Sequence, residues 1–268
     1  MDFSKVKLVV SDMDGTLLNR ESEVSTRFFN QFNALKEKNI HFIAASGRQY
    51  QSILDKLHSI KDDISIIAEN GGIMKYNNEE HILLKLTSEN VQRSVSLLRM
   101  VEDAYIVLCG RKRAYIETSS EDFISRFSKY YKEYAIVDDL TKVDDDDFLK
   151  IAVFHYESSE KHILPIAKAL RTDLQVIVSG ENWLDISHAE ANKGYALNIL
   201  QQKLGVTKEE TMVFGDYNND LEMLELAYFS YAMENGHDDV KKTARFITKS
   251  NAEEGVETIL DKLLNHGL

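Results

Sequence analysis

The sequence lacks the features that are typical of secreted and membrane-bound proteins, namely paired cysteines, long apolar runs and a signal peptide. Cys109 is the single cysteine among 268 residues, which excludes a disulfide and a cysteine-ligated zinc site within the chain. No apolar run approaches the roughly 20 residues that a membrane-spanning helix needs. The first residues also lack the basic-then-apolar pattern of a signal peptide. We therefore expect a reduced, cytoplasmic protein that has no membrane partner.

Proline and positive charge are also scarce. Pro165 is the single proline, and no stretch rich in proline, glycine or serine marks a flexible linker. Acidic residues outnumber Lys and Arg by 44 to 32, which gives a net charge of −12. Such a surface repels phosphate backbones, so we expect no nucleic-acid partner. A small phosphorylated metabolite is still allowed as a partner, because a bound metal and a few local cations reverse the field inside one cleft.

Both ends of the chain show the pattern of a parallel α/β sheet. Short, apolar, β-branched runs alternate with segments of helical spacing, and this order is typical of right-handed crossovers between parallel strands. The predicted strands are 6–10, 42–45, 64–68, 212–214, 229–233 and 246–248, and the predicted helices are 24–38, 53–57, 195–204, 221–227, 238–244 and 253–264.

The middle of the chain has a different pattern. Two apolar runs flank Asn77-Asn78 and predict a hairpin, after which helices alternate with paired strands. The predicted helices there are 88–101, 120–131 and 160–171, and the predicted strands are 105–109, 114–117, 151–154 and a hairpin through Val176 and Trp183. We expect a doubly wound, Rossmann-like α/β core of residues 1–83 and 188–268, with an inserted α+β cap of residues 84–187.

Polar residues follow the ends of four predicted core strands. They form the segments Asp12–Thr16, Ser46–Arg48, Glu69–Gly72 and Gly215–Asp220. In an open parallel sheet, ligands bind beyond the carboxyl ends of the strands. We therefore expect these carboxylates, hydroxyls, amides and glycines to meet at one rim of the sheet.

Two carboxylates separated by one residue follow the first strand. Asp12-x-Asp14-Gly15 has a simple turn as its alternative, since Asp and Gly favour turns. A calcium loop is disfavoured, because such a loop follows a helix and places its glycine later. Phosphoryl transfer to a carboxylate needs an oxygen nucleophile fixed beside a metal, and a second carboxylate can protonate the leaving oxygen and then activate water. This chemistry makes Asp12 the candidate nucleophile and Asp14 the candidate acid and base.

The last acidic segment offers a third carboxylate. Asp216 to Asp220 has an incomplete calcium loop or an acidic helix cap as alternatives, but Leu221 stands where a calcium loop requires glycine. The functional interpretation makes Asp216 a ligand of Mg²⁺, with Asn219 and Asp220 orienting the site. Because the ligands are all oxygen atoms, the expected cofactor is Mg²⁺.

Phosphate ligands are expected where two helices are predicted to begin. Ser46 has helix capping as its ordinary role, but its hydroxyl and the amide of Gly47 also suit a phosphate. Lys193 opposes the helix dipole, which suggests that it holds the phosphoryl group and reduces the charge of the nucleophile. The alternatives are a surface position for Lys193 and a local salt bridge for Arg48.

Taken together, the motifs resemble those of the haloacid dehalogenase superfamily. The matching segments are Asp12-Met13-Asp14-Gly15-Thr16, Ser46-Gly47-Arg48, Asn192-Lys193-Gly194 and Gly215-Asp216-Tyr217-Asn218-Asn219-Asp220. The stretch from Ala232 to Ala244, followed by Glu254-Gly255-Val256, is similar to the signature of Cof-type sugar-phosphate phosphatases. Ser46 and Glu234 stand where many relatives carry Thr and Gly, and neither change removes a required group.

This resemblance implies a Mg²⁺-dependent phosphatase that hydrolyses small phosphate monoesters, with hexose phosphates as the expected substrates, through an aspartyl phosphate. It implies Asp12 and Asp14 as catalytic residues, and Asp12, Asp14 and Asp216 as metal ligands, with the backbone carbonyl of Asp14 as an alternative to its side chain. The implied phosphate and substrate ligands are Ser46, Gly47, Arg48, Asn70, Gly71, Lys193 and Asn219, supported by Thr16 and Asp220.

Several alternatives stay open. Asn70-Gly71 is also compatible with a plain turn into the hairpin. A phosphomutase of the same superfamily would share every core motif, and a phosphatase could instead act on pyridoxal phosphate or flavin mononucleotide. A dehalogenase is disfavoured because it lacks a second acid such as Asp14. A binding protein without activity is disfavoured because Asp12, Asp14, Lys193 and Asp216 are all present. We expect a monomer.

Overall fold

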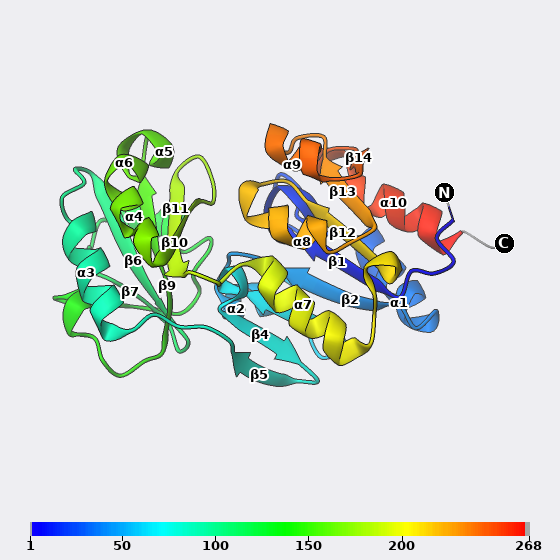
Figure 1. The fold of residues 1–268 in the computed structure, drawn as a ribbon, viewed down its shortest axis with the longest axis horizontal. Coiled ribbons are helices and arrows are strands. Elements are labelled where there is room, and N and C mark those ends of the chain that lie inside the picture. The colour runs from blue at the N-terminus through cyan, green and yellow to red at the C-terminus, as the bar shows by residue number, and fades with distance from the viewer. Residues whose placement is uncertain (1, 266–268) are drawn as a thin grey trace.

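The computed structural model describes residues 2–265, which form two lobes (Figure 1). The larger lobe contains an eight-stranded sheet in the order β14-β13-β12-β1-β2-β3-β4-β5. Its strands are β1 (Leu8–Asp12), β2 (His41–Ala45), β3 (Ser65–Ala68), β4 (Ile73–Tyr76), β5 (Glu79–Ile82), β12 (Thr211–Gly215), β13 (Phe229–Met233) and β14 (Phe246–Thr248). All neighbours from β14 to β3 pair in parallel, and β4 and β5 add an antiparallel hairpin at the edge.

Helices cover both faces of this sheet. The helices are α1 (Thr26–Glu37), α2 (Tyr50–Lys56), α7 (Lys193–Leu204), α8 (Leu221–Glu225), α9 (Asp238–Thr243) and α10 (Gly255–Leu264). Alternate residues of a strand point to opposite faces. Accordingly, Val9 packs in the cluster that includes α1, α2 and α10, while Leu8 and Val10 pack in the cluster that includes α7, α8 and α9. The predicted α/β core is confirmed.

The smaller lobe, which we call the cap, has a six-stranded sheet in the order β10-β11-β9-β6-β7-β8. All of its neighbouring strands are antiparallel except β7 and β8. The strands are β6 (Ala104–Gly110), β7 (Ala114–Ile116), β8 (Tyr134–Ile136), β9 (Phe148–His155), β10 (Leu174–Val178) and β11 (Trp183–His188). The helices are α3 (Ser88–Leu98), α4 (Glu121–Phe127), α5 (Ser159–His162) and α6 (Leu164–Ala167). Helices α3 and α6 pack on one face of the sheet, and α4 packs on the other.

Three details of the cap differ from the sequence prediction. The helix expected over 160–171 is divided into α5, α6 and a short 3₁₀ turn, Lys168–Thr172. Pro165 lies in α6, where its missing N–H group and its ring oppose continuation of the preceding helix. The helix expected over 120–131 already ends at Phe127, and β8 was not predicted. The domain boundaries stay a prediction, with residue 84 between β5 and α3 and residue 187 within β11.

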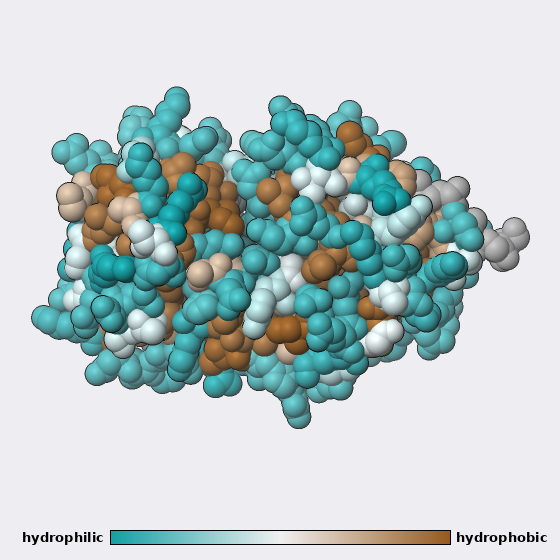
Figure 2. All heavy atoms as spheres, in the orientation of Figure 1, coloured by the Kyte–Doolittle hydropathy of each residue, from teal (hydrophilic) through white to brown (hydrophobic). Residues whose placement is uncertain are grey.

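Hydrophilic side chains dominate the face of the protein shown in Figure 2, and smaller hydrophobic patches lie between them. Among residues 2–265, no helix combines the length and the apolar character that crossing a bilayer would require.

Candidate active site

The predicted nucleophile lies at the carboxyl end of a central strand. Asp12 ends β1, which pairs with both β2 and β12, and only 4% of the residue is exposed. Lys193 is the first residue of α7 and is fully buried. Its Nζ atom donates hydrogen bonds to Asp12 Oδ1 at 2.5 Å and to Asp220 Oδ1 at 2.6 Å. A lysine at a helix N-terminus is unfavourable for the helix dipole, and here two carboxylates compensate for it.

Three carboxylates form an acidic cluster at this end of the sheet. One oxygen atom from each of Asp12, Asp216 and Asp220 lies within 4.8 Å of the others. Asp220 is already engaged, because its Oδ2 accepts hydrogen bonds from the N–H groups of Asp216 and Tyr217 and its Oδ1 accepts one from Lys193. Asp220 therefore has less capacity left for an additional ligand.

The unused acceptors belong to Asp12 and Asp216. Asp12 Oδ2 is buried and finds no hydrogen-bond partner among the described residues. Asp216 Oδ1 accepts a hydrogen bond from Thr16 Oγ1 at 3.2 Å, and the supporting role of Thr16 in catalysis stays a prediction. Carboxylate oxygens are the donors that Mg²⁺ prefers, so these residues fit that cation. Asp12 and Asp216 would hold it, and Asp220 would orient them.

Glycine is required where the two acidic loops meet. Gly15 has a φ of +76°, and a Cβ atom there would lie 2.2 Å from Asp216 Oδ2. Any side chain would thus clash with Asp216 and also strain the backbone. The glycine of the first motif therefore serves to bring the Asp216 carboxylate close to β1.

Burial dominates the electrostatics of the cluster. Desolvation raises the pKa of Asp12 to about 7, and Lys193 opposes this rise. Desolvation followed by the charge of Asp12 raises the pKa of Asp216 well above its ordinary value. Asp12 and Asp216 are both destabilised in their charged forms by burial and by neighbouring carboxylates. A divalent cation between them would relieve that repulsion.

Asp14 lies apart from the acidic cluster. Its Oδ2 accepts a hydrogen bond from Arg48 Nε, and its Oδ1 accepts one from Arg48 Nη2, both at 2.6 Å. The arrangement does not support the side chain of Asp14 as a metal ligand, and the alternative role of its backbone carbonyl stays a prediction. The local salt bridge considered for Arg48 is present. Arg48 also reaches the cap, because its Nη1 donates to the carbonyl of Lys129 at 2.9 Å.

The predicted phosphate ligands lie along the same rim. Asn219 Nδ2 donates to Asn70 Oδ1 at 3.0 Å, and a Cβ atom on Gly47 would lie 2.8 Å from that same oxygen. Ser46 Oγ accepts a hydrogen bond from the N–H group of Arg48. Ser46 does not cap a helix, because α2 begins only at Tyr50. The structure thus brings these side chains together, and their contacts with substrate stay a prediction.

The turn at Asn70-Gly71 lies close to the motif Asn192-Lys193-Gly194. Gly71 has a φ of +93°, and a Cβ atom there would lie 2.2 Å from the carbonyl oxygen of Asn192. The side chain of Asn192 accepts a hydrogen bond from the N–H group of Tyr195 and so caps α7. Gly71 therefore lets the loop after β3 pack against the helix start that carries Lys193.

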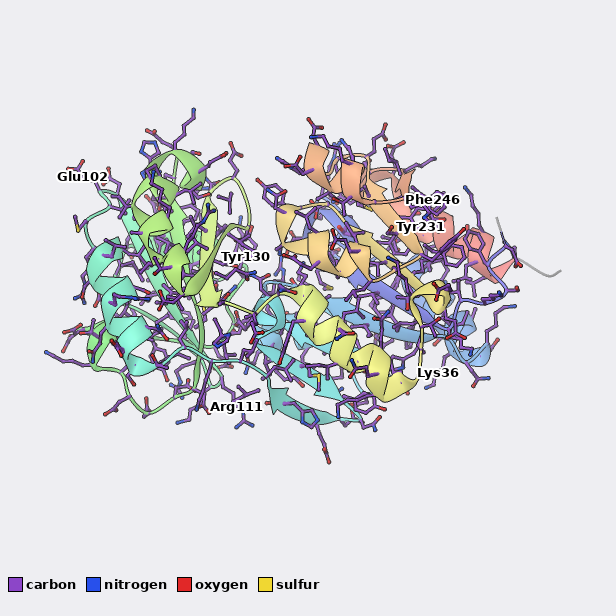
Figure 3. The ribbon with its side chains drawn as sticks, viewed as in Figure 1. Lys36, Glu102, Arg111, Tyr130, Tyr231 and Phe246 are labelled. Carbon is purple, nitrogen blue, oxygen red and sulfur yellow. The ribbon has the colours of Figure 1, made fainter. Side chains whose placement is uncertain are left out.

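A cavity of about 400 Å³ lies between the two lobes at this rim. This volume is in the range of small-molecule sites. In Figure 3, Tyr130 lies on the side of the cap that faces the core. From the core, the cavity is lined by Asp12, Asp14, Gly15, Ser46, Gly47, Arg48, Asp216, Tyr217 and Asn219. From the cap, it is lined by Arg126, Lys129, Tyr130, Tyr131, Lys150, Phe154, Ser179, Gly180, Glu181, Asn182, Trp183 and Asp185.

Sequence reasoning assigned none of the cap residues in this lining to the site. One signal was available, because Lys150 interrupts the apolar run Phe148–Phe154. A charged residue inside a buried strand needs a partner, so it is a candidate for a structural or functional role. The aromatic residues carry no comparable signal, since most aromatic residues in such strands belong to the core.

Comparison with known proteins shows which family the chain belongs to. Residues 9–260 match the family model of haloacid dehalogenase-like hydrolases. The chain belongs to this family. It is 32% identical over 267 residues to the 5-amino-6-(5-phospho-D-ribitylamino)uracil phosphatase YbjI of Escherichia coli, covering 97% of each chain. It is 25% identical to the phosphatase of the same name from Bacillus subtilis, YwtE, covering 97% of this chain and 99% of the other.

A solved structure gives the same result for the fold. The crystal structure of SMU.1108c from Streptococcus mutans has a TM-score of 0.90 and 29% identity, covering 97% of this chain and 99% of that one. The resemblance found in the motifs is thus confirmed, and this member of the haloacid dehalogenase-like hydrolases is a phosphatase.

Proposed function

We propose that the chain is a Mg²⁺-dependent phosphatase that hydrolyses small phosphate monoesters through a phosphorylated Asp12. The observation that carries this proposal is the environment of Asp12. Its Oδ1 is fixed by Lys193, while its Oδ2 is buried and free of hydrogen bonds from described residues. One oxygen atom of Asp12 also lies within 4.8 Å of one oxygen atom of Asp216. Such an oxygen can attack phosphorus only if nearby cations reduce the repulsion between the carboxylate and the phosphate.

The core residues supply each step. Asp12 attacks phosphorus in line, and Lys193 and Asn219 hold the phosphoryl oxygens together with Ser46 and the Gly47 amide. Mg²⁺, when bound, would neutralise negative charge on the carboxylates and the phosphoryl group. Asp14 protonates the leaving oxygen and then deprotonates the water that opens the acyl phosphate.

Asp14 can reach this role by exchanging partners. Its carboxylate is bound to Arg48, but 42% of its side chain is exposed and it lines the cavity. An arriving phosphate monoester would compete for the Arg48 guanidinium, which binds planar oxyanions well. That exchange would turn Asp14 toward the leaving oxygen.

The leaving group is contacted by the cap. Hexose phosphates are the substrates expected from the motifs. A specific observation favours a second candidate, because Tyr130, Tyr131, Phe154 and Trp183 form an aromatic wall on the cap side of the cavity. A planar ring can stack on such a wall. Phosphorylated ribitylaminouracil, the compound in the names of the two curated relatives, has such a ring. The cytoplasmic location stays a prediction.

The test is a phosphate-release assay of the purified protein with and without Mg²⁺. The panel contains hexose phosphates, phosphorylated ribitylaminouracil, flavin mononucleotide, pyridoxal phosphate and phenyl phosphate. We expect Mg²⁺-dependent release of inorganic phosphate. Full turnover after exhaustive chelation would contradict the metal dependence, and an isomerised sugar phosphate as the main product would indicate a mutase.

A further inference from the structure

A buried lysine of the cap, which lines the cavity, also contacts two loops of the core. Lys150 lies within β9, and only 2% of the residue is exposed. Its Nζ atom donates a hydrogen bond to the carbonyl oxygen of Gly47 at 2.5 Å. It also lies 3.2 Å from Glu69 Oε2 of the core and 3.2 Å from Asp185 Oδ2 of the cap. One ammonium group therefore connects two core loops and two cap strands.

We propose that Lys150 and Asp185 are positioning residues through which the cap completes the phosphate-binding loops of the core. The inference rests on the proposed function, because it concerns the ligands of the phosphoryl group. It assigns the cap a second role, distinct from contact with the leaving group.

The first step concerns the peptide group between Gly47 and Arg48. Glycine leaves the backbone free to rotate, so this peptide could turn its carbonyl oxygen toward the phosphate. Lys150 holds that oxygen on the cap side, and the N–H group of the same peptide donates to Ser46 Oγ at 3.1 Å. A carbonyl oxygen facing a phosphate would repel it, so the ammonium group keeps the loop in its binding form.

The second step runs from Asp185 through the amide of Asn70. Asp185 Oδ2 accepts a hydrogen bond from Asn70 Nδ2 at 2.5 Å. The other end of that amide, Oδ1, accepts a hydrogen bond from Asn219 Nδ2 at 3.0 Å. Asp185 thus fixes which way the Asn70 amide points, and Asn70 in turn holds Asn219, a predicted phosphate ligand.

The loop that carries Asn70 needs this restraint. Glu69 and Asn70 have φ values of +50° and +53°, a left-handed conformation that is unfavourable for residues other than glycine. The N–H groups of Glu69 and Asn70 donate to the carbonyls of Arg48 and Ser46, so the two loops move together. Contacts from Lys150 and Asp185 hold both loops at once, which explains why a charged cluster is buried there.

The two roles of the cap predict different kinetics. A residue that touches the leaving group affects substrates unequally, whereas a residue that positions phosphate ligands affects every phosphate ester equally. Misplacing such ligands by a fraction of an ångström to 1 Å is expected to reduce kcat/KM by about 10- to 100-fold. The same misplacement should also weaken the binding of inorganic phosphate, which has no leaving group.

The experiment compares Lys150→Met and Asp185→Asn with the wild-type protein. We measure kcat and KM for phenyl phosphate and for the best substrate of the panel, and the inhibition constant of inorganic phosphate. Because Lys150→Met leaves buried carboxylates without their cation, the variant Lys150→Met/Glu69→Gln is included to preserve the net charge of the cluster. Lys142→Met is the matched control, since Lys142 is a cap lysine whose side chain is 82% exposed.

We expect equal losses of kcat/KM on both substrates and a comparable rise in the inhibition constant of phosphate, with Lys142→Met unchanged. A loss confined to the larger substrate would overturn the inference and place Lys150 against the leaving group. Unchanged phosphate inhibition in folded variants would overturn it as well. If the wild-type protein hydrolyses no ester, the proposed function fails, and the inference then depends on phosphate binding measured by calorimetry.

Discussion

The core rim and the cap wall line the same cavity but differ in the side chains that they present. The rim presents charged groups, and the wall presents aromatic rings. The core rim fixes buried charges through short contacts, as Lys193 does with Asp12 and Asp220. The cap wall, meaning the aromatic residues Tyr130, Tyr131, Phe154 and Trp183, is built from packed rings, with Trp183 5.8 Å from Tyr130 between ring centroids. Charged, fixed groups suit the phosphoryl group, and aromatic surfaces suit a variable leaving group.

The two regions also differ in how they affect the stability of the fold. Burying Asp12, Asp216 and Asp220 together is unfavourable unless cations compensate for their charges. The cap wall rests instead on ring packing such as the contact of Trp183 with Phe154 at 5.0 Å. Substitutions in the rim should therefore abolish reaction, and substitutions in the wall should redistribute it among substrates.

The largest effect is expected from the nucleophile. Asp12→Asn should reduce turnover by at least about 10³-fold on all substrates, because an amide cannot form an acyl phosphate. The fold should persist, since a buried carboxylate with a raised pKa is being replaced by a neutral group. Steady-state kinetics and thermal unfolding check this, with the exposed Asp62→Asn as the control. Retention of wild-type turnover would show that Asp12 is not the nucleophile.

The second effect concerns the cation that holds the nucleophile. Lys193→Met should lower kcat/KM by about 10²- to 10³-fold for every substrate, because a charged ligand of the transition state is lost. Thermal stability should also fall, since Asp12 and Asp220 lose their buried partner. The loss of kcat/KM is measured with the same substrate panel. A loss that differs strongly between substrates would argue against a role of Lys193 at the phosphoryl group.

A smaller and selective effect is expected from the wall. Trp183→Ala should reduce kcat/KM by about 2- to 10-fold for substrates with a planar ring, since one aromatic contact contributes about 0.5–1.5 kcal/mol. Reaction with a small ester such as methyl phosphate should change little. The substrate panel thus tests whether the cap wall, unlike the core rim, determines substrate preference. If the order of substrate preference stays the same while all rates fall together, the wall has no part in specificity.

The smallest effect concerns pH and the cation. The raised pKa of Asp12, about 7, means that the metal-free native state holds a proton that the unfolded state releases near pH 3.8. Stability of the metal-free protein should therefore fall as the pH rises from about 4 to 7. Mg²⁺ competes with that proton, so its stabilising effect should be larger at pH 8 than at pH 5.5. Differential scanning fluorimetry with Mg²⁺ and with chelator measures it; equal stabilisation at both pH values would disprove the linkage.

The fold and the rim residues were predictable from sequence for one reason. In a parallel sheet, all strands end at the same edge, so residues that follow strands meet whatever their separation along the chain. Thr16 and Asp216 are 200 residues apart and yet form a hydrogen bond. Local patterns sufficed to locate the strands, and the parallel topology then brings the residues at their ends together.

The remaining contacts depend on how the lobes pack, which no local pattern encodes. The bond from Asp185 to Asn70 joins residues of different lobes, and the pairing of Asp14 with Arg48 depends on side-chain orientation. The broken helix at Pro165 could have been anticipated from the proline. β8 could not, because three residues of strand carry too little periodicity.

The most direct test of the division between rim and wall is to locate the phosphoryl group during turnover. The enzyme is mixed with excess substrate and Mg²⁺, quenched in acid within milliseconds, and digested for mass spectrometry. We predict one phosphorylated peptide, containing residues of β1, with the modification on Asp12 and absent from Asp12→Asn. A phosphoryl group on any other residue, or turnover without a trapped acyl phosphate under conditions where its hydrolysis is rate-limiting, would contradict the proposed chemistry.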